Sequence, residues 1–156
     1  MNLWQRYSVN NKAMNAPQCL SLHFEKGIDP AFRKLCIQFA NWLRKNYHFP
    51  VHINIHIKDC EKIRLIGGQL AYGGFRYFKS RTPYIRIPAR IAPNLKEEYE
   101  DIEIYYSILG SLVHEITHYY QWCAGFTQTE AVSERQANYF RFRILEQFCK
   151  DCDLPY

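Results

Sequence analysis

Apolar side chains recur at helical spacing in three long segments of the chain. The first segment covers about residues 29–48, with Asp29 placed as an N-cap and Pro30 at the first helical position. The second covers about residues 93–125, where acidic residues in the first turns suit the positive end of a helix. The third covers about residues 129–150. The pattern therefore predicts three amphipathic helices, the second of them long and uninterrupted.

Shorter segments have the two-residue alternation of β-strands. Residues 51–57 alternate strictly between apolar and polar side chains, and residues 83–88 do so again. The proline that ends the second strand favours an edge position, where a missing backbone donor is tolerated. Residues 20–24 and the segments between the paired glycines, 69–78, predict further short strands or a hairpin.

These elements predict an α+β fold in one domain that spans residues 1–156. An N-terminal helix is followed by a small, mostly antiparallel sheet, a long helix and a C-terminal helix. Residues 1–20 are mixed and polar, and we expect them to form a surface arm. No repeat, low-complexity segment or domain boundary interrupts the chain.

Composition narrows the class of protein. With 47% hydrophobic and 22% charged residues, the chain is expected to be globular and not disordered. The net charge of +5 suits an acidic partner without requiring one. No segment resembles a signal peptide or a membrane span, which predicts a cytoplasmic protein without a membrane partner. The six cysteines are then expected to be free thiols.

The second predicted helix contains the pattern His114-Glu115-x-x-His118. Residues four apart lie on the same helical face, so the two imidazoles can bind one metal ion. Glu115 is then placed to act on water at that metal, as in hydrolytic zinc sites. The alternatives are two buried, hydrogen-bonded histidines, or a zinc domain without activity.

A catalytic zinc site needs a third protein ligand and an open position. No histidine follows His118, so the downstream candidates are carboxylates, chiefly Glu130 and Glu134. Both lie on the same face of the last predicted helix. Glu130 also suits the helix N-terminus, where the dipole favours a carboxylate.

The segment Glu134-Arg-Gln-Ala137-Asn138 resembles the Glu-x-x-Ala-Asn signature of the ImmA/IrrE-type metallopeptidases. Together with His-Glu-x-x-His, the resemblance covers about residues 110–145. It implies a minimal zincin-like fold of the gluzincin type, one zinc ion per chain, and Glu134 as the third ligand. It also implies that Asn138 hydrogen-bonds a ligand histidine. The chain departs from the family at Thr117, where a small residue such as glycine is common.

The resulting hypothesis is a zinc-dependent endopeptidase with Glu115 as general base and a protein or peptide as substrate. The strand at 83–88 offers an edge on which an extended peptide could pair, with Tyr84 and Arg86 as substrate-binding candidates. An ordinary edge strand explains the same pattern equally well.

Other clusters of residues carry less chemistry. His52 and His56 lie about 13 Å apart on a strand, too far to share a metal ion. Cys149 and Cys152 have half of a zinc-ribbon spacing and are interpreted as two tail thiols. Residues 75–81 interleave aromatic and basic side chains, as nucleic-acid-binding strands do. The alternative function is therefore a non-enzymatic nucleic-acid- or protein-binding module with a structural zinc.

Overall fold

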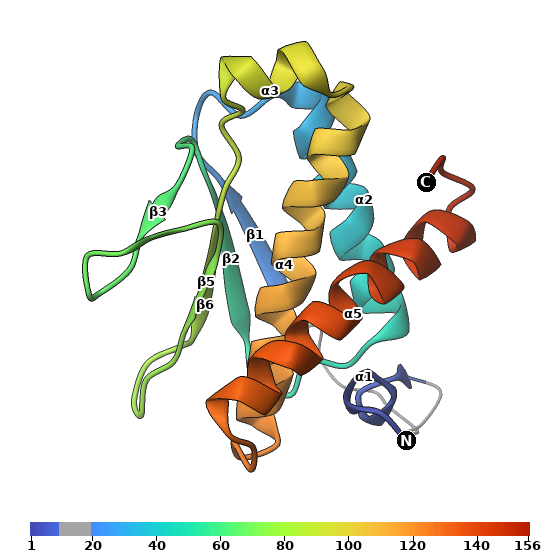
Figure 1. Cartoon of the computed structure of the whole chain (residues 1–156). Helices are drawn as coiled ribbons and strands as arrows, with labels where there is room; N and C mark the ends of the chain where they lie inside the picture. The colour runs from blue at the N-terminus through green and yellow to red at the C-terminus, as the bar shows by residue number, and fades with distance from the viewer. Residues whose placement is uncertain (10–19) are drawn as a thin grey trace.

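A mixed four-stranded sheet forms one layer of the computed structural model, which describes residues 1–9 and 20–156 (Figure 1). The strand order is β1-β2-β6-β5, with β1 parallel to β2, β2 parallel to β6, and β5 antiparallel to β6. The strands are β1 Leu20–Phe24, β2 Ile53–Lys58, β5 Gly74–Arg76 and β6 Tyr84–Pro88. Two short strands, β3 Ile63–Arg64 and β4 Leu70–Ala71, form a separate antiparallel pair.

The predicted α+β order is confirmed, but two features of the predicted sheet are wrong. The four-stranded sheet is not mostly antiparallel, because helix α2 (Pro30–Asn46) connects β1 to β2 as a crossover between parallel strands. Strand β6 is not an edge strand, since β2 pairs with one side of it and β5 with the other. Its proline stands at the last position of the strand.

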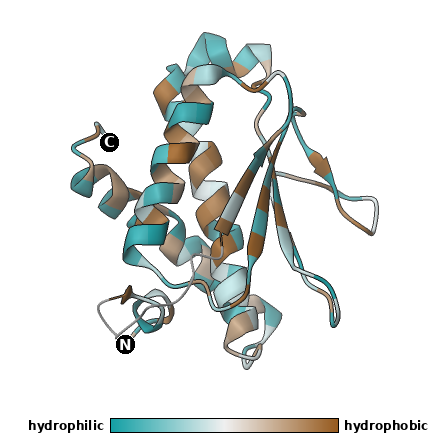
Figure 2. Ribbon diagram, turned by 180° about the vertical axis from the view of Figure 1, so that it is seen from behind, coloured by the Kyte–Doolittle hydropathy of each residue, from teal (hydrophilic) through white to brown (hydrophobic). Residues whose placement is uncertain are grey.

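The sheet separates its side chains onto two faces. The isoleucines of β2 and β6 are at most 1% exposed and belong to the core under the helices. The alternating polar residues lie on the opposite face, and the register aligns His23, His56 and Arg86 across three strands. Figure 2 shows hydrophobic residues on the strands and on the helices packed against them.

Three long helices form, as predicted; α2 and α4 pack against the sheet, and α5 packs across α4. Asp29 caps α2 by accepting a hydrogen bond from the amide of Ala31. Helix α4 (Asp101–Cys123) ends before Gly125, which has a positive φ, and α5 (Glu130–Asp151) begins after the N-cap Thr129. No helix in the described residues is long and apolar enough to cross a membrane.

The segment from Pro93 is not one continuous helix, contrary to the prediction. A short helix, α3 (Pro93–Glu98), ends at Tyr99, whose backbone is extended, as is that of Glu100. Helix α3 buries no residue, whereas α4 buries side chains from Ile104 onward. The helix is therefore interrupted where packing against the rest of the protein begins.

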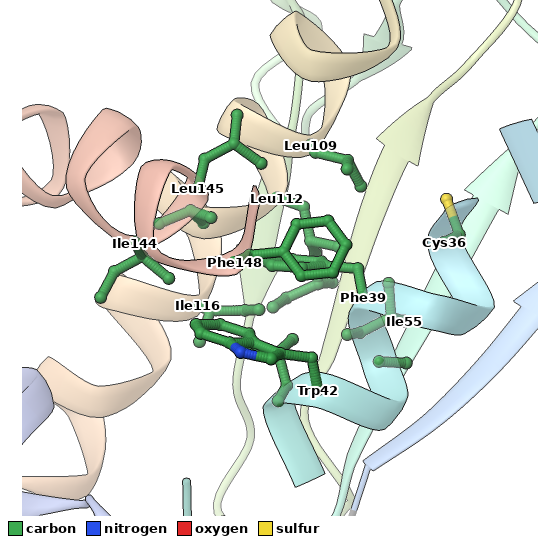
Figure 3. Close-up of a cluster of buried hydrophobic side chains, with 14 of the residues drawn as sticks. Cys36, Phe39, Trp42, Ile55, Leu109, Leu112, Ile116, Ile144, Leu145 and Phe148 are labelled. Carbon is green, nitrogen blue, oxygen red and sulfur yellow. The ribbon is translucent and has the colours of Figure 1, made fainter. Parts of the chain in front are cut away.

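The core lies between α2, α4, α5 and the sheet (Figure 3). Phe39 of α2 packs edge-on against Phe148 of α5, with ring centroids 4.8 Å apart. Leu112 and Ile116 of α4 are buried in the same cluster. This packing fixes α4 and α5 relative to the sheet.

The N-terminus is folded, so the predicted surface arm is wrong for its first residues. Residues Leu3–Arg6 form helix α1, which Asn2 begins with a capping box. Trp4 is only 1% exposed, and its ring packs against those of Tyr47 and Tyr120. The remainder of the predicted arm, residues 10–19, lies outside the described residues. All cysteines within the described residues are free.

Candidate metal centre

Helices α4 and α5 bring three potential metal ligands together. In Figure 1, α5 crosses the C-terminal half of α4, which carries His114 and His118. Nε2 of His118 lies 3.1 Å from Nε2 of His114. The two carboxylate oxygens of Glu134, on α5, lie 3.2 Å from Nε2 of His114 and 2.9 Å from Nε2 of His118. The three side chains therefore converge on one point.

The geometry of this group fits a tetrahedral divalent ion. With zinc–ligand bonds of about 2.0–2.1 Å, neighbouring ligands of a tetrahedral site lie about 3.3 Å apart. The three atom pairs lie 2.9–3.2 Å apart, close to that spacing. The two imidazoles and one carboxylate also form the donor set of many catalytic zinc sites. Within the described residues, only this combination of histidine, cysteine or acidic side chains is arranged to hold a metal ion.

The rival ligand Glu130 does not join the group. It is the first residue of α5 and is exposed, one turn before Glu134. The metal-binding arrangement includes Glu134 and not Glu130. Glu130 stands in the first turn of the helix, where the helix dipole favours a carboxylate.

The ring of His118 is oriented by Gln121, a residue that the sequence analysis missed. The amide nitrogen of Gln121 donates to the carbonyl of Ser133 at 3.0 Å and to Oε1 of Gln136 at 2.8 Å. Its oxygen therefore faces Nδ1 of His118, at 2.8 Å, and Nδ1 carries the hydrogen. This leaves the lone pair of Nε2 directed at His114 and Glu134. An Nε2 lone pair that faces a carboxylate and a second imidazole is suited to bind a metal ion between them.

Asn138, on the facing helix α5, lies within hydrogen-bonding reach of the His114 side chain. The pKa of His114 is lowered, chiefly by burial and then by the charge of His118. A hydrogen bond with the Asn138 side chain acts to raise it. Nδ1 of His114 is buried and has no hydrogen-bond partner among the described residues. The arrangement places Asn138 beside the predicted ligand, and its role in orienting His114 stays a prediction.

Glu115 lies beside the three ligands and is largely buried, with 9% of its surface exposed. Burial and, to a lesser extent, the charge of Glu134 raise the pKa of Glu115 to about 8. The backbone amide of Phe75 on β5 donates a hydrogen bond to its carboxylate and opposes this shift. The carboxylate thus lies between the ligands on α4 and the edge of the sheet.

Gly73 sits directly against Glu115. A Cβ atom at Gly73 would come within 3.1 Å of Cγ and 3.2 Å of Oε1 of Glu115, and within 3.2 Å of Cδ1 of Ile87. The glycine pair at 73–74 suggested a turn in the sequence, but its first member also makes room for the candidate general base. In the sequence, the only sign of this role is that residue 73 is a glycine.

Tyr84 and Arg86, the predicted substrate-binding residues, are not brought to this centre. Both lie on β6 and point to the outer, polar face of the sheet, whereas Ile85 and Ile87 face the core. Arg86 donates a hydrogen bond to the carbonyl of Arg64 at 3.0 Å, and its ring neighbour is Tyr84. The histidines His52 and His56 also belong to the outer face.

No model of a known protein family, no curated protein and no solved structure matches the chain. The function must therefore be argued from the side chains and their geometry.

Proposed function

We propose that the protein is a zinc-dependent peptidase that hydrolyses peptide bonds. The observation that carries this proposal is the convergence of His114, His118 and Glu134, with Glu115 buried beside them. A structural zinc site usually has four protein ligands, whereas this group has three and leaves room for a reacting molecule. A carboxylate beside such a group adds nothing to metal binding, but it suits a general base.

The chain's own residues divide the work between binding and proton transfer. Zinc held by the three ligands would activate water and polarise the carbonyl of the scissile bond. Glu115 accepts a proton from the attacking water and returns it to the leaving amine. The amide of Phe75 holds the Glu115 carboxylate in place. The Gln121 carbonyl orients His118, so that Nε2 of His118 points into the centre.

The substrate would lie along β5 and not along β6. Strand β5 pairs with β6 on one side, and within the described residues no other strand pairs with its second side. The amide of Phe75 points from this strand to Glu115, which places the edge beside the proposed base. An extended peptide can add to a free sheet edge by backbone hydrogen bonds. The resemblance of residues 134–138 to the Glu-x-x-Ala-Asn signature supports the same family of reactions.

Metal analysis of three variants tests the proposal. The purified protein should contain about one zinc ion per chain, as expected of a site with one set of ligands. Glu134→Ala should lose the metal, Glu115→Gln should keep it, and both should fail to cleave a peptide library. Glu130→Ala is the matched control and should keep both metal and activity. A wild-type protein that binds no zinc would overturn the proposal.

A second candidate function rests on the outer face of the sheet. Arg76 and Arg81 lie over the ring of Phe78, at 5.0 Å and 4.0 Å from its centroid. That ring is 5.9 Å from the ring of Tyr84, which is 5.9 Å from that of His56. Aromatic rings and guanidinium groups on a sheet favour single-stranded nucleic acid, with bases stacked and phosphates paired.

Binding of a fluorescent single-stranded oligonucleotide distinguishes this candidate. Affinity that falls steeply between about 50 and 200 mM salt, and falls again in Arg81→Gln, would support it. Arg33→Gln is the control, because Arg33 lies over Phe24 on the first strand and away from this cluster. Binding that neither salt nor Arg81→Gln weakens would exclude it.

A further inference from the structure

A cavity of about 780 Å³ has Ser111 and Arg141 among its lining residues, whereas the three candidate metal ligands and Glu115 do not line it. Its walls come from the end of β6, from α3 and the following residues, and from α4 and α5, with Tyr72 on the β4–β5 connection. Apolar side chains such as Leu95 and Ile108 line much of it. Ser111 and Arg141 line the part that approaches the centre, because Ser111 lies one turn before Glu115 on α4.

Arg141 is a charged group of this cavity whose charge is not neutralised. Its Nη2 donates to the carbonyl of Ser107 at 3.2 Å and to Oγ of Ser111 at 3.1 Å. Its Nε is buried without a hydrogen-bond partner among the described residues. No carboxylate in the described part of the chain lies within ion-pair distance of the guanidinium. The guanidinium is partly buried and the charge of Glu115 acts on it, but no carboxylate of the described residues pairs with it directly, so it can accept an anionic partner.

Two other cations, Arg90 and Lys62, line the cavity. Arg90 pairs with the carboxylate of Asp59 at 3.1 Å and also donates to its carbonyl. The ammonium of Lys62 lies 5.4 Å from the ring centroid of Tyr72. Lys62 keeps its N–H donors in this contact, so Arg141 and Lys62 are the lining cations open to an anion, while Glu61 and Glu103 are the acidic lining residues.

The fold makes room for this guanidinium beside the centre. A Cβ at Gly110 would lie 3.0 Å from Nε and 3.2 Å from Cγ of Arg141, so a larger residue would displace the side chain. The Arg141 side chain therefore occupies the space that Gly110 leaves open. Arg141 follows Glu134 by two helical turns, and its charge lowers the pKa of both Glu115 and His114.

We propose that Arg141 binds a carboxylate of the substrate in this cavity, and so makes the protein selective for acidic peptides. This inference rests on the proposed peptidase function and names the substrate class of the same site. The carboxylate is either the free C-terminus of the peptide or an aspartate or glutamate side chain. Because Nη2 of Arg141 already donates to Ser107 and Ser111 and its Nε is buried, either carboxylate would accept its hydrogen bonds from Nη1.

Matched peptides separate these two sources. Each peptide is compared as a free acid and as a C-terminal amide, and an aspartate-containing peptide is compared with its asparagine analogue. The wild-type protein should prefer one acid over its neutral partner by about 10- to 100-fold in kcat/KM, as charged hydrogen bonds do. Preference for the free acid identifies the C-terminus, and preference for aspartate identifies a side chain.

The variant Arg141→Met should abolish that preference while its zinc content stays at the wild-type level. Arg141→Lys keeps the positive charge but not the planar guanidinium group, and should retain part of the preference for the acidic peptide. Arg143→Met is the control, because the exposed Arg143 lies over the ring of Tyr139, 4.0 Å from its centroid. A purely structural role would lower activity on acids and amides equally and would overturn the proposal.

Binding measurements keep this inference separable from the proposed function. Glu115→Gln should retain the ligands but not cleave, so calorimetry can compare its affinity for the same acid and amide peptides. Tighter binding of the acid that disappears when Arg141→Met is added supports the carboxylate site, even if the wild-type protein cleaves nothing. Cleavage by the wild-type protein without any preference for acids would overturn the inference and leave the peptidase proposal intact.

Discussion

The indole N–H of Trp4 donates a hydrogen bond of 3.0 Å to Oγ1 of Thr117, which immediately precedes His118. The Thr117 hydroxyl in turn donates to the carbonyl of Val113 at 2.8 Å. Helix α1 is thereby attached to α4 at the turn that carries both candidate histidine ligands. Thr117 is fully buried, but its hydroxyl accepts a hydrogen bond from Trp4 and donates one to Val113. These two bonds explain why a polar residue is tolerated there.

Trp4→Phe should lower the free energy of unfolding by about 1–3 kcal/mol, because the Thr117 hydroxyl loses its buried donor. Urea unfolding followed by circular dichroism measures the change. Trp122→Phe is the matched control. Trp122 is only partly buried, and its indole N–H donates no hydrogen bond within the described residues. Equal losses in the two variants would show that the Trp4–Thr117 bond contributes nothing specific.

Gln121→Leu should weaken zinc binding by about 10- to 100-fold, the usual effect of removing a group that orients a ligand histidine. The Gln121 oxygen lies 2.8 Å from Nδ1 of His118, and leucine cannot accept that hydrogen bond. Competition with a chromogenic chelator measures the affinity. Gln38→Leu, at an exposed position of α2, should leave it unchanged. Unaltered affinity in Gln121→Leu would mean that His118 needs no such support.

Gly73→Ala should reduce peptide hydrolysis by at least about tenfold, equivalent to about 1.4 kcal/mol, and leave zinc content unchanged. The added methyl would press on the Glu115 side chain at 3.1–3.2 Å and displace the carboxylate. Gly67→Ala serves as control, because its nearest neighbour would be at an ordinary 3.6 Å. Full activity in Gly73→Ala would argue against Glu115 as the base.

Asp29→Ala should destabilise the protein by about 1 kcal/mol at neutral pH, the usual effect of losing an N-cap. Asp29 accepts hydrogen bonds from the hydroxyl of Tyr105 and the amide of Ala31, which lower its pKa. The ionised carboxylate therefore stabilises the fold above its ordinary pKa of about 4, and the effect disappears as pH falls through the lowered value. The stability difference between wild type and variant should shrink below about pH 4, as measured by urea unfolding at several pH values. A difference that does not depend on pH would exclude a charge effect.

The parts of the structure that were predicted from the sequence depend on neighbours close along the chain. Helix α5 and the position of its N-cap Thr129 follow from local spacing and capping chemistry. The convergence of His114 and His118 follows from the period of one helix. Even the choice of Glu134 over Glu130 came from a short motif, and the grouping in space agrees with it.

The parts that were not predicted depend on residues far apart in sequence. Trp4 meets Thr117 across 113 positions, and nothing near Trp4 signals that contact. Arg141 resembles any surface arginine until Gly110 of another helix is found to face it. The position of β6 between β2 and β5 likewise depends on pairing, which alternation along one strand does not specify.

The location of Glu134 on the last helix has a consequence for the order in which the protein matures. A chain growing from its N-terminus completes α2 and most of the sheet before the third ligand has been synthesised. The proposed metal centre cannot be assembled until α5 packs on α4, so zinc binding would begin only after α5 has been synthesised.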